Sequence, residues 1–324
     1  MTVDAKILSA LREAGTSGIT ATLLLKKSGE TATGLTTRIS ALQRLGYEIE
    51  STPHLGYRLI GQPDLLNADD LMSRLAFPRI VGRDIQVFQE TSSTNDIAEK
   101  LARDGVAEGV AIFAESQSKG RGRLGRKWLS PRGQGLWFSI LLRPRLTPGS
   151  VTQLTIATAT AVARALRTQT GLTPQIKWPN DILFDGKKAV GILTELSAEA
   201  DRVRYVIIGI GVDVNVTDFP PEISAIATSL AQAAGRRFVR AEVAAAILNA
   251  MEHDYGRIMH GQFTAVAEEW EEQCITLGRG VRIHNGDRTM SGRAESLDTD
   301  GALLLRTDHG HLERIVGGDV TIEN

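Results

Sequence analysis

The chain has 324 residues, of which 42% are hydrophobic and 23% charged, and its formal net charge is -1. This length predicts two or three domains, and the composition is typical of a globular protein. The near-neutral charge argues against a wholly basic coat, so any nucleic-acid binding must be local. The single cysteine, Cys274, excludes an intrachain disulfide framework and a multi-cysteine metal site.

The N-terminus lacks a basic patch followed by an apolar core and a cleavage site. The densest apolar run, residues 205–212, is much shorter than the roughly 20 residues that span a bilayer. We therefore expect a cytoplasmic protein with no membrane partner.

Residues 1–46 contain three segments in which apolar side chains recur at steps of three and four, which predicts three helices. Gly46 ends the third helix, and two short extended runs follow around a turn at residues 52–56. This order predicts a winged helix-turn-helix in residues 1–63.

Residues 66–273 mix apolar strands with amphipathic or alanine-rich helices, which predicts a mixed α/β domain. Ser93 or Thr94 should cap one of the helices. Short strands separated by Gly-Asp and Asp-Gly turns follow in residues 274–324 and predict a small β-barrel. In the central domain we expect strands at 85–89, 110–114, 136–142, 182–184, 189–196 and 203–214, and helices at 155–168, 240–260 and 263–272.

An arginine-glycine loop, Gly120–Trp128, carries the clearest chemical signal. Its glycines formally match a dinucleotide-binding fingerprint, but that motif needs a helix directly after the loop. Here residues 136–142 read as a strand, which argues against a dinucleotide fold. Glycine backbone and planar guanidinium groups suit phosphate oxygens, and Trp128 suits a base or an apolar ligand. The alternative is a solvated, flexible basic loop.

A second chemical signal is a hairpin around Asp185-Gly186, a turn dipeptide between apolar runs. In the expected register, Leu183 pairs with Lys188 and Asp181 pairs with Val190. A surface cluster of ion pairs is the alternative to a functional site. If the first strand starts at Lys177, one face carries Lys177, Pro179, Asp181, Leu183 and Lys188.

This combination suits adenylation of a carboxylic acid. The carboxylate attacks the α-phosphorus of ATP, and cations must hold the two anions together and neutralise charge on the phosphoryl oxygens. Asp181 would hold Mg²⁺, and Lys188 would bridge the carboxylate and the phosphate. No protein nucleophile is required.

Several segments carry a joint pattern: Ser93–Asn95, Gln117, Gly120–Trp128, Lys177–Asp181, Lys188–Gly191 and Gly209–Gly211. Together they resemble the biotin protein ligases, specifically the bifunctional type that also represses the biotin operon. The likeness covers nearly the whole chain and implies a core like that of class II aminoacyl-tRNA synthetases and an SH3-like C-terminal barrel. It also implies two steps: biotin and ATP give biotinyl-5′-adenylate, and a lysine of a biotin carboxyl carrier domain then displaces AMP.

The resemblance implies roles for individual residues. Catalysis would involve Lys188, Arg121, Arg123 and Asp181, of which Asp181 also meets the metal. Biotin would contact Ser93, Thr94, Asn95, Gln117, Arg121, Gly122, Arg123 and Lys188. ATP and the adenylate would contact Arg123, Trp128, Lys177, Asn180, Asp213 and Asn215.

One position departs from the family pattern. The family usually has Asn where this chain has Asp213. Asn donates and accepts hydrogen bonds, whereas ionised Asp only accepts. Asn215 is the candidate that takes over part of this role.

The predicted third helix would contact operator DNA through Thr33, Thr36, Thr37 and Arg38. It has fewer cations than the resemblance leads one to expect, and a protein-interaction module or a relic is the alternative. Specific binding requires a homodimer that supplies two half-sites.

Two other functions compete with this interpretation. One is a transcription regulator that binds a small effector in a degenerate ligase core, and the intact loop with Asp181 and Lys188 argues against it. The other is a ligase for lipoate, and the long arginine loop and the winged helix favour biotin.

Overall fold

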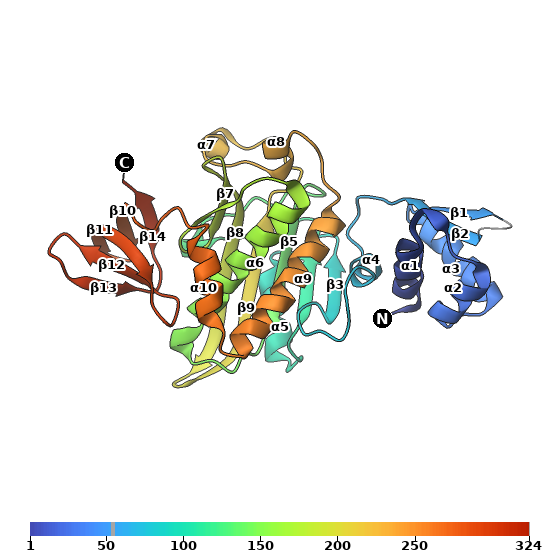
Figure 1. Cartoon of the computed structure of the whole chain (residues 1–324), viewed down its shortest axis with the longest axis horizontal. Coiled ribbons are helices and arrows are strands. Elements are labelled where there is room, and N and C mark those ends of the chain that lie inside the picture. The colour runs from blue at the N-terminus through green and yellow to red at the C-terminus, as the bar shows by residue number, and fades with distance from the viewer. Residues whose placement is uncertain (53–55, 324) are drawn as a thin grey trace.

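The computed structural model describes residues 1–52 and 56–323. Figure 1 shows three parts in chain order: small helices with a two-stranded sheet, a central sheet covered by helices, and a C-terminal antiparallel sheet. This order confirms the fold class predicted from the sequence.

The described residues of the N-terminal part form three α-helices, and at each the side chain of a preceding threonine accepts a hydrogen bond from the first turn. The predicted turn at residues 52–56 includes residues 53–55, which lie outside the described residues. The elements are α1 (Val3–Ala14), α2 (Ala21–Ser28), α3 (Ala32–Arg44), β1 (Glu48–Thr52) and β2 (Gly56–Gly61), and the two strands pair antiparallel.

Buried charges attach this part to the central domain at helix α4 (Ala68–Met72). The Asp70 carboxylate is buried and forms ion pairs with Arg12 of α1 and, at 3.1 Å, with Arg74. Gln62 of the connecting segment accepts hydrogen bonds from both arginines, at 3.2 Å and 2.6 Å. The N-terminal part is therefore fixed to the core by side-chain contacts as well as by the chain.

The central sheet has seven strands in the order β3-β4-β5-β9-β8-β7-β6, and only the β3–β4 pair is parallel among the described strands. The strands are β3 (Asp84–Phe88), β4 (Val110–Ala114), β5 (Leu136–Leu142), β6 (Gln175–Lys177), β7 (Asp181–Phe184), β8 (Lys187–Glu199) and β9 (Arg202–Val212).

Helices cover both faces of this sheet. Ala111 and Phe113 of β4 join the large apolar core with α6 and α9, whereas Val110 and Ile112 join a smaller cluster with α5. Burial on both faces explains why β4 reads as an unbroken apolar run and why β5 is apolar except at Ser139. The helices are α5 (Thr94–Arg103), α6 (Thr152–Thr170), α7 (Pro221–Ser224), α8 (Leu230–Ala234), α9 (Arg240–Met259) and α10 (Phe263–Glu271).

The C-terminal sheet is antiparallel throughout its described strands, in the order β13-β12-β11-β10-β14. Its buried residues, among them Val281 and Leu303, belong to the same apolar cluster as the central domain. In the described residues, no helix is long and apolar enough to cross a membrane. The strands are β10 (Gly280–Asn285), β11 (Arg288–Leu297), β12 (Leu303–Thr307), β13 (Leu312–Ile315) and β14 (Asp319–Ile322).

Candidate active site

A cavity of about 450 Å³ lies on the α5 face of the central sheet. Every residue that the sequence predicts to contact biotin, ATP or the metal lines it, except Asn215. These residues are Ser93, Thr94, Asn95, Gln117, Arg121, Gly122, Arg123, Trp128, Lys177, Asn180, Asp181, Lys188 and Asp213.

One end of the cavity is a chain of neutral polar groups. Gln117 Oε1 accepts from the backbone N–H of Thr94 at 2.8 Å. The Thr94 hydroxyl lies 2.6 Å from that of Ser139, which donates to Asn95 Oδ1 at 2.5 Å. Ser93 occupies the cap position of α5, but its side chain makes no capping bond, so its hydroxyl remains available to a ligand. Such a wall suits a neutral polar ring.

The arginine-glycine loop is ordered by its own backbone. Gly122 N–H donates to Arg126 at 2.7 Å, and Trp128 N–H donates to Gly120 at 2.9 Å. The loop then leads into strand β5, as the sequence predicts. These bonds argue against a flexible loop, although residues 124–127 are exposed to solvent.

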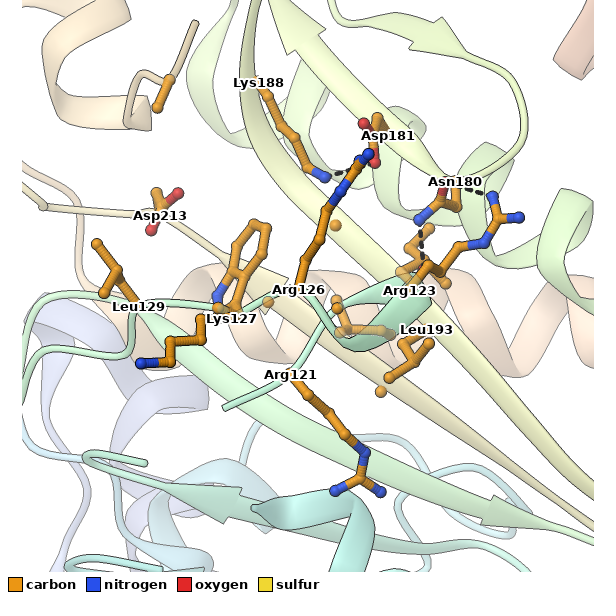
Figure 2. A pocket seen from close by; sticks show the side chains of 18 of the residues that line it. Arg121, Arg123, Arg126, Lys127, Leu129, Asn180, Asp181, Lys188, Leu193 and Asp213 are labelled. Carbon is orange, nitrogen blue, oxygen red and sulfur yellow. Dashed lines mark hydrogen bonds and ion pairs between the residues drawn. The ribbon is translucent and has the colours of Figure 1, made fainter. Parts of the chain in front are cut away.

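Ion pairs hold the two ends of this loop. Arg121 pairs with Asp96 of α5 at 2.5 Å and with Glu195 of β8 at 3.0 Å. Burial disfavours the charge on Arg121, but Glu195 and Asp96 outweigh it and raise the pKa of the guanidinium. Arg126 pairs with Asp319 of the C-terminal sheet. In Figure 2 Arg121 points away from Lys188 and Asp181, so the structure does not bring it to the other predicted catalytic residues.

Arg123 instead points toward the segment before β7, where it donates to Asn180 Oδ1 at 3.2 Å (Figure 2). Burial lowers the pKa of its guanidinium, a shift that Asp181 opposes. A partly desolvated cation gains more than an exposed one from an incoming phosphate.

Lys188 and Asp181 face each other across a hairpin, with Nζ 2.6 Å from Oδ1 (Figure 2). The sequence analysis placed Lys177 and Asp181 in one continuous strand, and this was wrong. The strand does not run on from Lys177, because the chain reverses at residues 178–180 and Lys177 pairs with Asp181 in the antiparallel β6–β7 pair. The residues still converge, because a cross-strand pair shares a face.

The expected register was also only half right. Leu183 pairs with Lys188, but Asp181 pairs with Gly191 and Ile182 with Val190. A bulge in β8 accounts for the extra residue. It lets Val190 enter the apolar core while Lys188 turns into the cavity.

Trp128 lies across strands β8 and β9. A Cβ atom on Gly211 would come within 2.5 Å of its indole ring, and one on Gly191 within 2.7 Å. Only glycine permits this approach. Lys188 Nζ lies 5.3 Å from the centre of the ring, within range of a cation–π contact.

Asp213 lines the cavity and is only 7% exposed. Burial raises the pKa of its carboxyl well above 3.8, although Lys188 opposes this. A protonated carboxyl both donates and accepts, as an amide does. Asn215 does not share this place, because its side chain bonds both to the carbonyl and to the N–H of Phe238. The expectation that Asn215 assists Asp213 was therefore wrong.

Several cavity contacts escaped the sequence analysis. Glu195 accepts from Asn95 at 2.6 Å and binds Arg121, and its position in a predicted strand gave no sign of these partners. Phe219 and Ile226 line the cavity from the segment after β9. Asp319 comes from the last strand of the chain, and no local motif marks it.

Within residues 1–52 and 56–323, no group of three or more His, Cys, Asp or Glu side chains could hold a metal ion. Asp181 is the carboxylate nearest to Lys188, and Mg²⁺ commonly takes one or two carboxylates with phosphates and waters. The donor set therefore fits a magnesium ion that arrives with phosphate groups.

Comparison with known proteins defines the class. Residues 87–213 match the Biotin/lipoate A/B protein ligase family, and residues 276–322 match the Biotin protein ligase C terminal domain. The bifunctional ligase/repressor of Bacillus subtilis is 38% identical over 99% of both chains. The Escherichia coli bifunctional ligase/repressor is 28% identical over 91% of this chain and 90% of its own. The chain belongs to the biotin protein ligase family, in its bifunctional ligase/repressor branch.

Solved structures agree with this assignment. A biotin protein ligase from Aquifex aeolicus in complex with biotin and ATP has a TM-score of 0.64 and 32% identity, over 74% of this chain and 99% of that one. The Leishmania major enzyme in complex with biotinyl-5-AMP has a TM-score of 0.51 and 25% identity, over 72% and 98%.

Proposed function

We propose that this cavity joins biotin to ATP and then to a lysine of a biotin carboxyl carrier domain. One observation carries the proposal: a neutral polar wall and a cluster of cations meet in a single cavity. The polar wall, Ser93 to Asn95 with Gln117, would bind the ureido ring of biotin. The cations would bind the acid's carboxylate and the phosphates at the other end.

Lys188 is the residue placed to join the two substrates. Its ammonium would leave Asp181 for the shared space between carboxylate and α-phosphate, where it neutralises developing charge. Arg123, half-buried beside Asn180, would hold the phosphate of the adenylate. Trp128 would flank the adenine, and Asp213, as a neutral acid, would donate to one ring nitrogen and accept from an amino group. Lys177 also lines the cavity and pairs with Asp181 across strands β6 and β7.

Asp181 would hold Mg²⁺ once Lys188 has moved toward the substrates. A bound magnesium ion supplies positive charge to the phosphate oxygens. Asp181 contributes a fixed carboxylate whose position depends on the β7–β8 pairing.

The transfer step needs no protein nucleophile. The neutral amine of the acceptor lysine attacks the acyl carbon, an amide C–N bond forms, and the acyl C–O bond to phosphate breaks. AMP leaves with the electron pair, and the amine loses a proton to solvent. The loop from Gly120 to Trp128 would exclude water until the acceptor arrives.

We also propose that the N-terminal part binds operator DNA as a homodimer, in the cytoplasm. The predicted DNA contacts all lie exposed on α3, the helix that follows α2: they are Thr33, Thr36, Thr37 and Arg38. The bifunctional relatives are named as repressors, which supports this function. Sedimentation that shows a monomer both with and without adenylate would contradict the dimer.

Mass spectrometry of the whole protein after incubation with biotin and Mg²⁺-ATP tests the ligase function. We expect biotinyl-AMP bound to the protein and pyrophosphate in solution. Binding of biotin without pyrophosphate would instead indicate an effector-binding regulator. Activation of lipoate but not biotin would show that the acid substrate is lipoate.

A further inference from the structure

Asp213 is a buried acid whose side chain has no partner in the protein. It is 7% exposed and lines the cavity. Within residues 1–52 and 56–323 its carboxyl forms no hydrogen bond and no ion pair, and no dashed line reaches it in Figure 2. A buried polar group without a partner is costly to the fold, so this one points to a partner that arrives with a ligand.

The backbone holds Asp213 in a defined place at the end of strand β9. Its N–H donates to the carbonyl of Ala189 at 2.9 Å, and its carbonyl accepts from the N–H of Leu230 at 2.9 Å. Two residues earlier, Gly211 lies against the indole of Trp128. Because residues two apart in an extended chain share a face, the carboxyl stands on the face of the sheet that Trp128 covers.

Apolar side chains of the segment after β9, among them Phe219 and Ile226, line the cavity near this carboxyl. The N–H of Lys188 donates to the carbonyl of Ile226 at 2.8 Å, and the next residue, Ala189, bonds to Asp213. The segment and the acid therefore flank the same two residues of β8. An indole, apolar side chains and one acid suit a flat heterocycle with hydrogen-bonding groups on its rim, such as the base of a nucleotide.

The hydrogen-bonding pattern of Asp213 depends on its proton. A neutral carboxyl donates through O–H and accepts through C=O, which matches a ring nitrogen and the amino group of adenine. A carboxylate only accepts, which matches the two adjacent donors of guanine, the N–H of its ring and its amino group. The carboxylate would face a lone pair on the ring nitrogen of adenine. An amide never presents two acceptors, so Asn lacks this alternation.

We infer that Asp213 selects the purine nucleotide of this cavity: ATP while its carboxyl is neutral, and GTP once it is ionised. The inference rests on the proposed function, in which a nucleotide activates the acid. The step balances with GTP as with ATP. A carboxylate oxygen of the acid bonds to the α-phosphorus, the bond from that phosphorus to the bridging oxygen breaks, and pyrophosphate leaves with the electron pair.

Few charges act on this carboxyl. Burial raises the pKa of Asp213 well above 3.8, and Lys188 of β8 opposes the shift. From the arginine-glycine loop, Lys127 lines the same cavity. The segment after β9 lines it only with uncharged residues, which are Phe219, Ile223, Ile226 and Ala227. The neutral form therefore persists above the pH at which an exposed aspartate ionises.

The test compares ATP with GTP in the same protein. Pyrophosphate release is measured with biotin, Mg²⁺ and either nucleotide from about pH 6 to about pH 8.5, and mass spectrometry identifies biotinyl-AMP or biotinyl-GMP. The ratio of kcat/KM for GTP to that for ATP follows the ratio of ionised to neutral acid. It should therefore rise by up to about tenfold per pH unit, whatever the exact pKa. The titration of Lys188 and of other groups common to both reactions cancels in this ratio.

Two variants separate Asp213 from other causes. Asp213→Asn keeps the shape of the side chain and removes its titration, so the ratio should stay constant with pH. Asp218→Asn makes the same change at an exposed residue that does not line this cavity, and its ratio should rise as in the unmodified protein.

Calorimetry supplies a readout that does not depend on turnover. GTP binds the ionised acid and ATP the neutral one, so GTP binding should release about one proton more than ATP binding. Heats of binding measured in two buffers of different ionisation enthalpy count these protons. The difference should vanish in Asp213→Asn.

Three results would overturn the inference. The first is a ratio that does not change with pH in the unmodified protein. The second is an equal slope in Asp213→Asn, which would assign the titration to another group. The third is the absence of biotinyl-GMP at every pH. Failure of the unmodified protein to form any adenylate with ATP is a separate result, against the proposed function itself.

Discussion

Lys188 in the cavity and Arg38 on α3 are both cations in candidate binding sites, but their surroundings differ. Lys188 owes its direction to a bulge in β8 and its position to an ion pair with Asp181. Arg38 lies on an exposed helix face, with only loose ion pairs to Asp4 at 3.5 Å and Glu30 at 3.9 Å.

The difference shows how much one side chain can contribute in each place. The cavity residues come from loops and strands far apart in sequence, and packing orients each of them. The side chains of α3 share one helix, and among the described residues Thr36 and Thr37 bond only to carbonyls of their own helix. Substitutions in the cavity should therefore have large single effects, whereas those on α3 should have small ones.

The largest effect should come from Lys188→Ala. We expect adenylation, measured as pyrophosphate release, to fall about 10²- to 10³-fold, because a preorganised charge at the reacting phosphate is lost. Lys187→Ala, at the exposed neighbouring residue of β8, is the matched control and should be nearly unaffected. A loss below tenfold for Lys188→Ala would show that Lys188 does not stabilise charge at the reacting phosphate.

Gly211→Ala should come next. The added Cβ would meet the indole of Trp128 at 2.5 Å and force it from its place. We expect a loss of about 1–3 kcal/mol in the free energy of unfolding, measured by denaturant titration. Gly256→Ala in α9, where a Cβ meets nothing within 4 Å, should instead gain up to about 1 kcal/mol. Equal effects at both glycines would refute the close contact with Trp128.

Asp213→Asn should raise stability in a pH-dependent way. Folding raises the pKa of Asp213, so the unfolded chain loses this proton first as pH rises above 3.8. The unmodified protein therefore loses stability over that range until the pH reaches the folded pKa, whereas Asn does not titrate. The difference in melting temperature should be smallest near pH 4 and widen toward pH 8. A constant difference would show that Asp213 is not a buried neutral acid.

Arg38→Ala should have the smallest effect. Loss of one phosphate contact should reduce the slope of log affinity against log salt by about 1, measured by anisotropy on a duplex selected with the intact protein. Pyrophosphate release should be unchanged, because α3 is remote from the cavity. An unchanged salt slope would show that Arg38 does not contact a DNA phosphate. A reduced rate of adenylation would show that α3 and the cavity do not act independently.

Local sequence patterns determined the elements and much of the chemistry. Strands β4 and β5 have the bounds that their apolar runs predict, because each is buried on both faces. Asp185-Gly186 forms the predicted hairpin turn, with Asp185 at φ 48° and Gly186 at φ 77°. The arginine-glycine loop was also recognisable, because its residue types and spacing carry the phosphate-binding chemistry proposed for it.

Tertiary structure decided the register and the partners. Asp181 pairs with Gly191 and not Val190, because Val190 is buried in the core and a bulge takes up the extra residue. Asp319 reaches the loop from the end of the chain only because the C-terminal sheet packs on the central domain. Periodicity and turn residues act over a few positions and are readable in the sequence. A register and an ion pair between distant segments depend on which packing buries the most apolar surface, which only the folded chain settles.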